Sequence, residues 1–146
     1  MTTFYSVRVA RIRPTSRSGR VGRDTVDLGL IELLEDDVES ARRTFMEVLT
    51  VAGRIGAGPS IAFGLLGLGF CAGMTNERNR AVTLHGAADK LFEFMGESLD
   101  PSLDGYRRRE HRRLSTEIGD LAFDAAYHFG QGLTHDEAVD LALASS

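Results

Sequence analysis

Residues 36–53, DDVESARRTFMEVLTVAG, decide the fold. Asp36 and Glu39 stand three residues apart at the start of this stretch, which is the spacing of a helix capping box. Apolar residues then recur every three or four positions along one helix face: Val38, Ala41, Phe45, Val48, Leu49 and Ala52. The glycine-rich residues 53–58 should end the helix, so the stretch predicts an amphipathic helix with one buried face.

The flanking sequence continues in the same way from Asp24 to the C-terminus. The predicted caps and breakers are Asp24, Pro59, Thr75, Gly96, Asp100, Gly119 and Thr134 with Glu137. They divide the chain into seven predicted helices over residues 24–34, 36–52, 59–73, 75–95, 100–118, 121–129 and 134–142. No alternating apolar run is long enough for a core strand. We therefore expect an all-α fold of antiparallel helical hairpins stacked in series.

The composition is that of one folded domain with a basic arm. The chain has 146 residues, 42% of them hydrophobic and 26% charged, which suffices for a single buried core. Residues 1–23 hold six arginines and no acidic residue, although the net charge of the whole chain is −4. We expect an extended or disordered basic arm over residues 1–23 and a helical domain over residues 24–146.

Cysteine usage and the N-terminus predict a cytoplasmic protein. The single Cys71 cannot form an intrachain disulfide, and three arginines interrupt the apolar residues where a secretory signal would need an unbroken core. Between Arg54 and Glu77 lie 22 uncharged residues, the length of a membrane span. Pro59 and the many glycines favour a buried helix instead, so no membrane contact is expected.

Two pairs of residues repeat along the chain. Leu28-Gly29 recurs as Leu66-Gly67, and Ala41 recurs as Ala81, a period near 40 residues. A glycine in one helix and an alanine in its partner let two helix backbones approach closely, and Phe45 fills the space beside them. The pattern resembles the tetratricopeptide repeat, with two extra residues allowed at the second turn. In the second repeat His85 takes the place of the aromatic residue. The resemblance implies a short TPR-like solenoid.

A second resemblance rests on motifs in the C-terminal half of the chain. They are Gly67-Leu68-Gly69, residues 84–88 (LHGAA), Tyr106, residues 119–123 (GDLAF), residues 132–134 (GLT), residues 137–139 (EAV) and Ala142-Leu143. Together they resemble the C-terminal helical-repeat region of large bacterial regulators, the multidomain signal-transduction ATPases of the LuxR class. The resemblance implies a regulatory scaffold that holds a partner or its own ATPase module. The chain has no phosphate-binding loop, so ATP hydrolysis does not carry over.

We therefore predict a non-enzymatic helical-repeat module that binds protein within a transcriptional or signalling circuit. The expected partner-binding residues are Phe63, Leu65 and Leu68 as apolar anchors, with Arg108 and Arg112 as a charged rim. They would line a groove formed by the first, third and fifth helices. Two outcomes stay open for the face of Leu65 and Leu68: it contacts a partner or a second copy in a homodimer, or it is buried within the chain.

Two alternatives stay open beside this prediction. The basic arm and the arginines of residues 107–113 could contact nucleic acid, in which case binding would fall steeply with salt. A small helical enzyme or ligand sensor would instead need a closed pocket where His85 or His128 meets polar partners. The spacing of the four histidines predicts no metal site, Cys71 is placed where a thiolate is disfavoured, and no catalytic or cofactor-binding residue is predicted.

Overall fold

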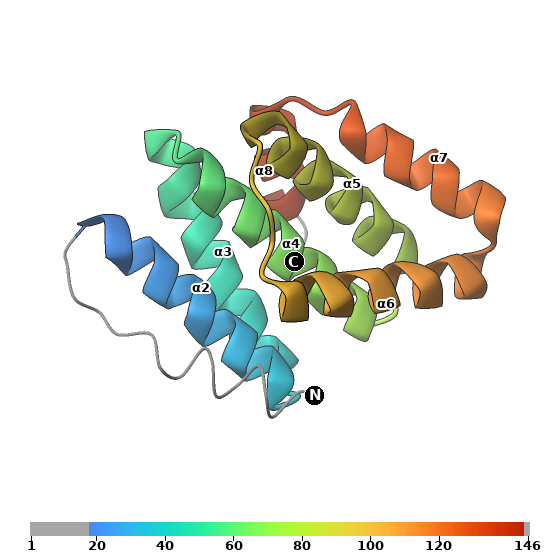
Figure 1. Ribbon diagram of the computed structural model, residues 1–146, viewed down its shortest axis with the longest axis horizontal. Helices are drawn as coiled ribbons and strands as arrows, with labels where there is room; N and C mark the ends of the chain where they lie inside the picture. Colours follow the sequence, from blue (N-terminus) through green and yellow to red (C-terminus); the bar gives the residue numbers. More distant parts are fainter. Residues whose placement is uncertain (1–17, 145–146) are drawn as a thin grey trace.

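The computed structural model describes residues 18–144, with side chains from residue 25 onward, and the regular secondary structure of this part of the chain is all α-helix (Figure 1). Its helices are α2 (Ser18–Leu34), α3 (Val38–Ile55), α4 (Gly58–Met74), α5 (Arg78–Met95), α6 (Pro101–Ile118), α7 (Asp120–Gln131) and α8 (His135–Ala144). The predicted all-α class is confirmed for these residues, and each predicted helix has its counterpart.

The N-terminal boundary of the helical region differs from the prediction. Helix α2 begins at Ser18, so residues 18–23 belong to a helix and not to the predicted arm. Once a helix is nucleated, each added residue gains a hydrogen bond, and arginine is a good helix former. The prediction for residues 1–17 lies outside the described residues.

Two predicted N-caps are displaced by the turns that precede them. Asp37, and not Asp36, caps α3, because its carboxylate accepts from the Ser40 N–H at 3.3 Å. Asp36 has a φ of 62° and ends α2 in the left-handed conformation. Thr75 does not cap α5: its hydroxyl donates to the Cys71 carbonyl oxygen at 3.1 Å, at the end of α4.

Other predicted caps are confirmed. Asp100 accepts from the Ser102 N–H at 3.1 Å at the start of α6. Thr134 and Glu137 form the predicted capping box, with the Thr134 N–H donating to Glu137 Oε1 at 2.9 Å and the Glu137 N–H to Thr134 Oγ1 at 3.1 Å. Gly96 ends α5 with a φ of 70°, a conformation that favours glycine.

The repeat is confirmed, but its register differs from the prediction. Helices α3 and α5 are offset by 40 residues, and their C-caps Gly56 and Gly96 have the same left-handed conformation. At this offset Gly29 is equivalent to Gly69, not to Gly67. A Cβ at Gly29 would lie 2.7 Å from the Phe45 ring, and one at Gly69 would lie 3.4 Å from the His85 ring. No extra residues are needed, and Gly67 instead packs against the other side of Phe45.

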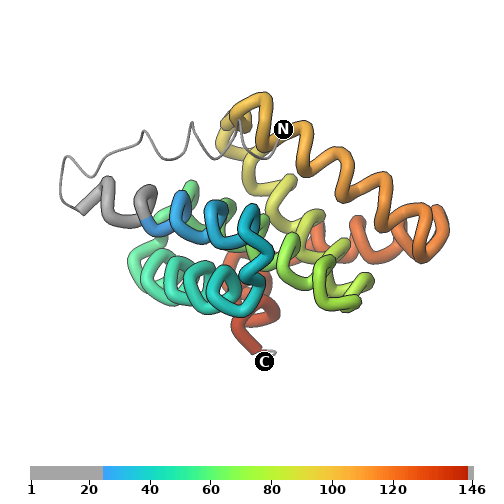
Figure 2. The backbone as a smooth tube through the Cα atoms, turned by 90° about the horizontal axis from the view of Figure 1, so that it is seen from below, coloured from blue at the N-terminus to red at the C-terminus, as the bar shows by residue number. Residues whose placement is uncertain are grey.

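The predicted serial stacking of helical hairpins is observed from α2 to α5, but the later helices do not continue it. Helix α7 packs along α5, at the opposite end of the molecule from α2 (Figure 1). Helix α8 returns to α3 and α4, and Figure 2 shows it crossing beside them toward the C-terminus. The contact between α5 and α7 is unusually close, because the Tyr127 carbonyl oxygen lies against Gly86 and the Thr83 carbonyl oxygen lies against Gly130.

The uncharged helix α4 lies at the centre of this arrangement. It packs on α3 and α5 along its length and also contacts α2, α6 and α8. Neighbouring helices therefore cover it on all sides, which explains its lack of charged residues. Among the described helices, none is both long enough and apolar enough to cross a bilayer.

Candidate functional site

The predicted apolar anchors on α4 lie inside the protein. Leu65 and Leu68 are 1% and 5% exposed, and α8 packs over this face of α4, with Ala138 next to Leu65. Phe63 is half-buried, edge-on to Phe92 with ring centroids 5.1 Å apart. The expectation that Leu65 and Leu68 are open to a protein partner is therefore wrong. The other outcome that the sequence left open is observed: this face of α4 is buried within the chain, because α8 folds back across α4.

Of the two arginines of the predicted rim on α6, Arg108 is paired with an acidic side chain of the described residues and Arg112 is not, while the neighbouring Arg113 is also paired. Arg108 donates to Asp104 Oδ2 at 2.9 Å, and Arg113 donates to Glu110 Oε1 at 2.7 Å. Arg112 is exposed and has no ion pair among the described residues. Arg112 is thus the member of the predicted rim that is most available to a partner. Contact of the basic arm with nucleic acid stays a prediction, since residues 1–17 lie outside the described part.

An apolar surface that the sequence did not assign to binding lies on α7. Leu121 is 86% exposed and Phe129 is 62% exposed, and the exposed Ala122 and Ala125 lie between them on the same helix face. We call these four residues the α7 stripe. Their spacing of three to four residues is typical of a face that buries against another element. Apolar residues that share one exposed helix face in this way depart from the usual scattered exposure of single apolar residues.

The α7 stripe arises because α7 is apolar on two faces. The helix predicted over residues 121–129 has as its apolar residues Leu121, Ala122, Ala125, Ala126 and Phe129. In the structure the inner face carries Phe123, Ala126 and Tyr127, which pack against α5 and α6. The signal was present in the sequence, since apolar residues surround α7 more widely than one face requires.

A buried polar cluster joins α5, α6 and α7. Its members are His85, Asp89, Arg107, His111 and Tyr127. Asp89 Oδ2 accepts from the Tyr127 hydroxyl at 2.6 Å and from Arg107 Nη1 at 3.0 Å. The His85 and His111 rings are nearly perpendicular, with centroids 4.7 Å apart. His111 Nε2 lies 3.9 Å from Asp89 Oδ2, beyond hydrogen-bond distance.

Burial sets the protonation states in the polar cluster. It holds the pKa of His85 well below the ordinary value, and the neighbouring His111 and Arg107 act in the same direction. Burial likewise lowers the pKa of His111 to about 4. The pKa of Asp89 is raised by burial, which outweighs the opposing effects of the Tyr127 hydrogen bond and of Arg107. Both histidines are therefore neutral at pH 7.

The polar cluster fits a structural role better than a chemical one. His85 is fully buried, so no substrate reaches it, and neither of its ring nitrogens has a hydrogen-bond partner among the described residues. It occupies the place that Phe45 fills in the first repeat and packs edge-on to Phe70. The ligand-sensor alternative required a closed pocket where His85 or His128 meets polar partners, and the ring nitrogens of His85 have no hydrogen-bond partner among the described residues. The cluster instead ties α6 and α7 to α5 through Asp89.

The other residues considered from sequence do not converge. His128 lies on the exposed side of α7 with its ring nitrogen 2.9 Å from the Asp124 carbonyl oxygen, whereas Tyr127 points to Asp89. Cys71 is buried, and burial raises the pKa of its thiol to about 12. Within residues 25–144, no three His, Cys, Asp or Glu side chains come together in a way that could hold a metal ion.

The fold and these surfaces are the basis for any functional statement about the chain. No family model, curated protein or solved structure matches it.

Proposed function

We propose that this chain is a non-enzymatic helical-repeat module that binds another protein, as part of a regulatory system of the LuxR-class kind that its sequence resembles. The observation that carries the proposal is the α7 stripe, where Leu121 and Phe129 stand exposed on the outermost helix of the stack. In a helical-repeat array the outer face of a terminal helix is where the next element would pack.

The α7 stripe is supported rigidly from behind. Gly86 of α5 contacts the backbone of α7 directly, and the hydroxyl of Tyr127 is fixed by Asp89 at 2.6 Å. A surface held in this way loses little conformational freedom when a partner binds. Docking on α7 therefore favours recognition by a preformed face over folding on binding.

The neighbouring helix indicates the chemistry of the partner. Arg108, Arg109 and Arg112 are exposed on α6, which joins α7 through Gly119. A partner helix with apolar residues at i and i+4 and acidic residues beside them would match the stripe and this charge. We favour a different, acidic partner over self-association because Arg109 and Arg112 are exposed and form no ion pair with a described residue.

Site-specific crosslinking tests the proposal. A photoreactive amino acid at position 121 should capture a discrete partner in cells that express the full-length chain, and the same residue at position 55 should not. Ile55 is the matched control because it is also an exposed apolar residue, 72% exposed, at the end of α3.

The captured partner is then measured against variants in purified form. Leu121→Glu and Phe129→Glu should weaken binding about tenfold or more each, and Ile55→Glu should leave it unchanged. Capture from both positions alike, or equal affinity in all variants, would contradict docking on α7. Light scattering adds a further outcome: a dimer dissociated by Leu121→Glu would assign the stripe to a second copy and overturn the proposal of a different partner.

A further inference from the structure

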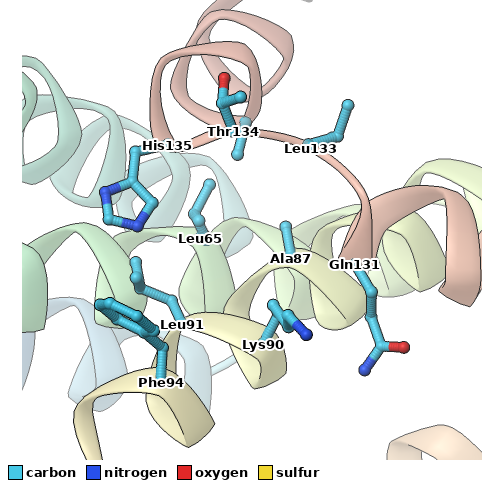
Figure 3. A pocket seen from close by; sticks show the side chains of 10 residues that line it. Leu65, Ala87, Lys90, Leu91, Phe94, Gln131, Leu133, Thr134 and His135 are labelled. Carbon is cyan, nitrogen blue, oxygen red and sulfur yellow. The ribbon is translucent and has the colours of Figure 1, made fainter.

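A pocket with apolar walls opens between α5 and the segment that joins α7 to α8 (Figure 3). Its volume is about 240 Å³. The floor is formed by Leu65, Leu91 and Ala138, which are all buried, and Ala87 completes the wall on the α5 side. We call it the α5/α8 pocket. It lies apart from the α7 stripe and from the polar cluster, so it bears on a different function.

Polar groups gather only at the rim of the α5/α8 pocket. Figure 3 shows His135 and Phe94 on the left of the pocket, and Lys90 and Gln131 toward its right. Lys90 carries the one permanent charge among the lining residues. It forms no ion pair with any described residue. It is also the single lysine in a chain whose other 16 basic residues are arginine.

We propose that the α5/α8 pocket binds a small monocarboxylate with an apolar tail, such as a medium-chain fatty acid. The carboxylate pairs with the Lys90 ammonium, while the tail covers Leu65, Leu91 and Ala138. Such a ligand would place its carboxylate against the unpaired ammonium of Lys90 and its apolar tail against the apolar floor of the pocket.

The size and charge of the pocket select this ligand class. Pockets for drug-sized ligands begin near about 300 Å³, so this one suits a smaller, fragment-sized ligand with a tail of roughly eight carbons. A phosphate or other dianion would bring two charges to one lysine beside an apolar floor, and the second charge would lose its hydration without compensation. A single carboxylate is neutralised by Lys90 alone.

Binding would add to the existing contact between α5 and α8, where Arg80 of α5 already donates to the Leu141 and Ala142 carbonyl oxygens of α8 at 3.0 and 2.9 Å. Lys90 lies on α5, whereas Ala138 lies on α8, the helix that covers α4. A ligand that pairs with Lys90 and covers Ala138 would stabilise the docking of α8. Because it binds only the folded protein, it would raise the thermal midpoint of unfolding in proportion to its concentration.

Titration of the full-length chain with octanoate tests this inference. Octanoate should bind in the micromolar to millimolar range, raise the thermal midpoint and shift the NMR methyl signals of Leu91 and Ala138. Acetate, which has the charge without the tail, and octanol, which has the tail without the charge, should each bind at least about tenfold more weakly. Octanol binding as tightly as octanoate would overturn the role of the carboxylate.

Variants locate the site. Lys90→Met should weaken octanoate binding about tenfold or more, whereas Arg109→Met, which removes an exposed cation from α6, should not. Ala87→Leu should fill the pocket and abolish binding. Lys90 is exposed, so its variant retains the fold even where the Ala87 variant fails. Absence of octanoate binding to the wild-type chain, or full binding by Lys90→Met, would refute the site without affecting the proposal for α7.

Discussion

Substitution of Gly86 by alanine should destabilise the protein, although alanine is the better helix former. Gly86 lies inside α5, where a Cβ would overlap the Tyr127 carbonyl oxygen and lie 3.2 Å from the Tyr127 Cα on α7. The obstruction is backbone and not a flexible side chain, so it cannot turn away. The two helices would have to separate, and the contacts that hold α7 would loosen together.

The expected magnitude follows from three contributions. Overpacking in a close contact costs about 1–3 kcal/mol. Displacement of Tyr127 weakens its hydrogen bond to Asp89, which contributes about 1 kcal/mol. The higher helix propensity of alanine offsets about 1 kcal/mol of this loss. The net effect is a decrease of about 2 kcal/mol in the free energy of unfolding, a large fraction of the usual stability of about 5–15 kcal/mol.

Gly105 provides a matched control for this prediction. It also lies within a helix, α6, but the nearest atom to a Cβ there is Arg109 Nη1 at 3.8 Å, an ordinary contact. Gly105→Ala should therefore stabilise the protein by about 0.5–1 kcal/mol. Urea denaturation followed by circular dichroism compares the two variants directly. If Gly86→Ala were as stable as Gly105→Ala, the close backbone contact between α5 and α7 would be refuted.

Three further predictions follow from the core. Leu65→Glu or Leu68→Glu should unfold the chain instead of dissociating an assembly, since both residues are buried, and circular dichroism of the purified variants would show it. Acid should destabilise the fold: the pKa of His111 is about 4 when folded and near 6.5 when unfolded, so His111 should lower the free energy of unfolding progressively as the pH drops from 6.5 to about 4, and the buried His85 should act in the same direction. Thermal melts over this range check the sign, and a flat profile would contradict it; His111→Phe should reduce the slope. The buried Cys71 thiol, whose pKa is raised to about 12, should resist a thiol reagent at neutral pH until denaturant is added, and rapid labelling of the native protein would argue against its burial.

The buried histidines explain why the second repeat differs from the first. Phe45 fills its site with an apolar ring between α2 and α4, whereas His85 at the equivalent position meets His111 of α6. A histidine without hydrogen-bond partners is less favourable there than phenylalanine would be. The surrounding helices also differ. Helix α6 contacts both α4 and α5 only loosely, at the position where a third repeat would pack a helical hairpin closely. The end of the regular repeat and the histidine pair thus occur at the same place.

The sequence by itself determined the helices of the described region and most of their ends. Apolar spacing, capping residues and glycines act over a few residues, so α3, α4, α5 and the capping box of α8 could be predicted without tertiary contacts. Glycine opposite a large ring likewise predicted that the first two hairpins pack closely, although only the structure fixed Gly69 as the partner of His85.

Tertiary structure alone decided which apolar faces are covered. Leu65 and Leu121 are both apolar residues within predicted helices, yet α8 buries the first, and the second stays 86% exposed on α7. The return of α8 to α4 joins residues far apart in sequence, and no local pattern encodes that pairing. The apolar surface that remains exposed for a partner depends on which helix α8 covers, because burial is a property of the whole packing and not of any one helix.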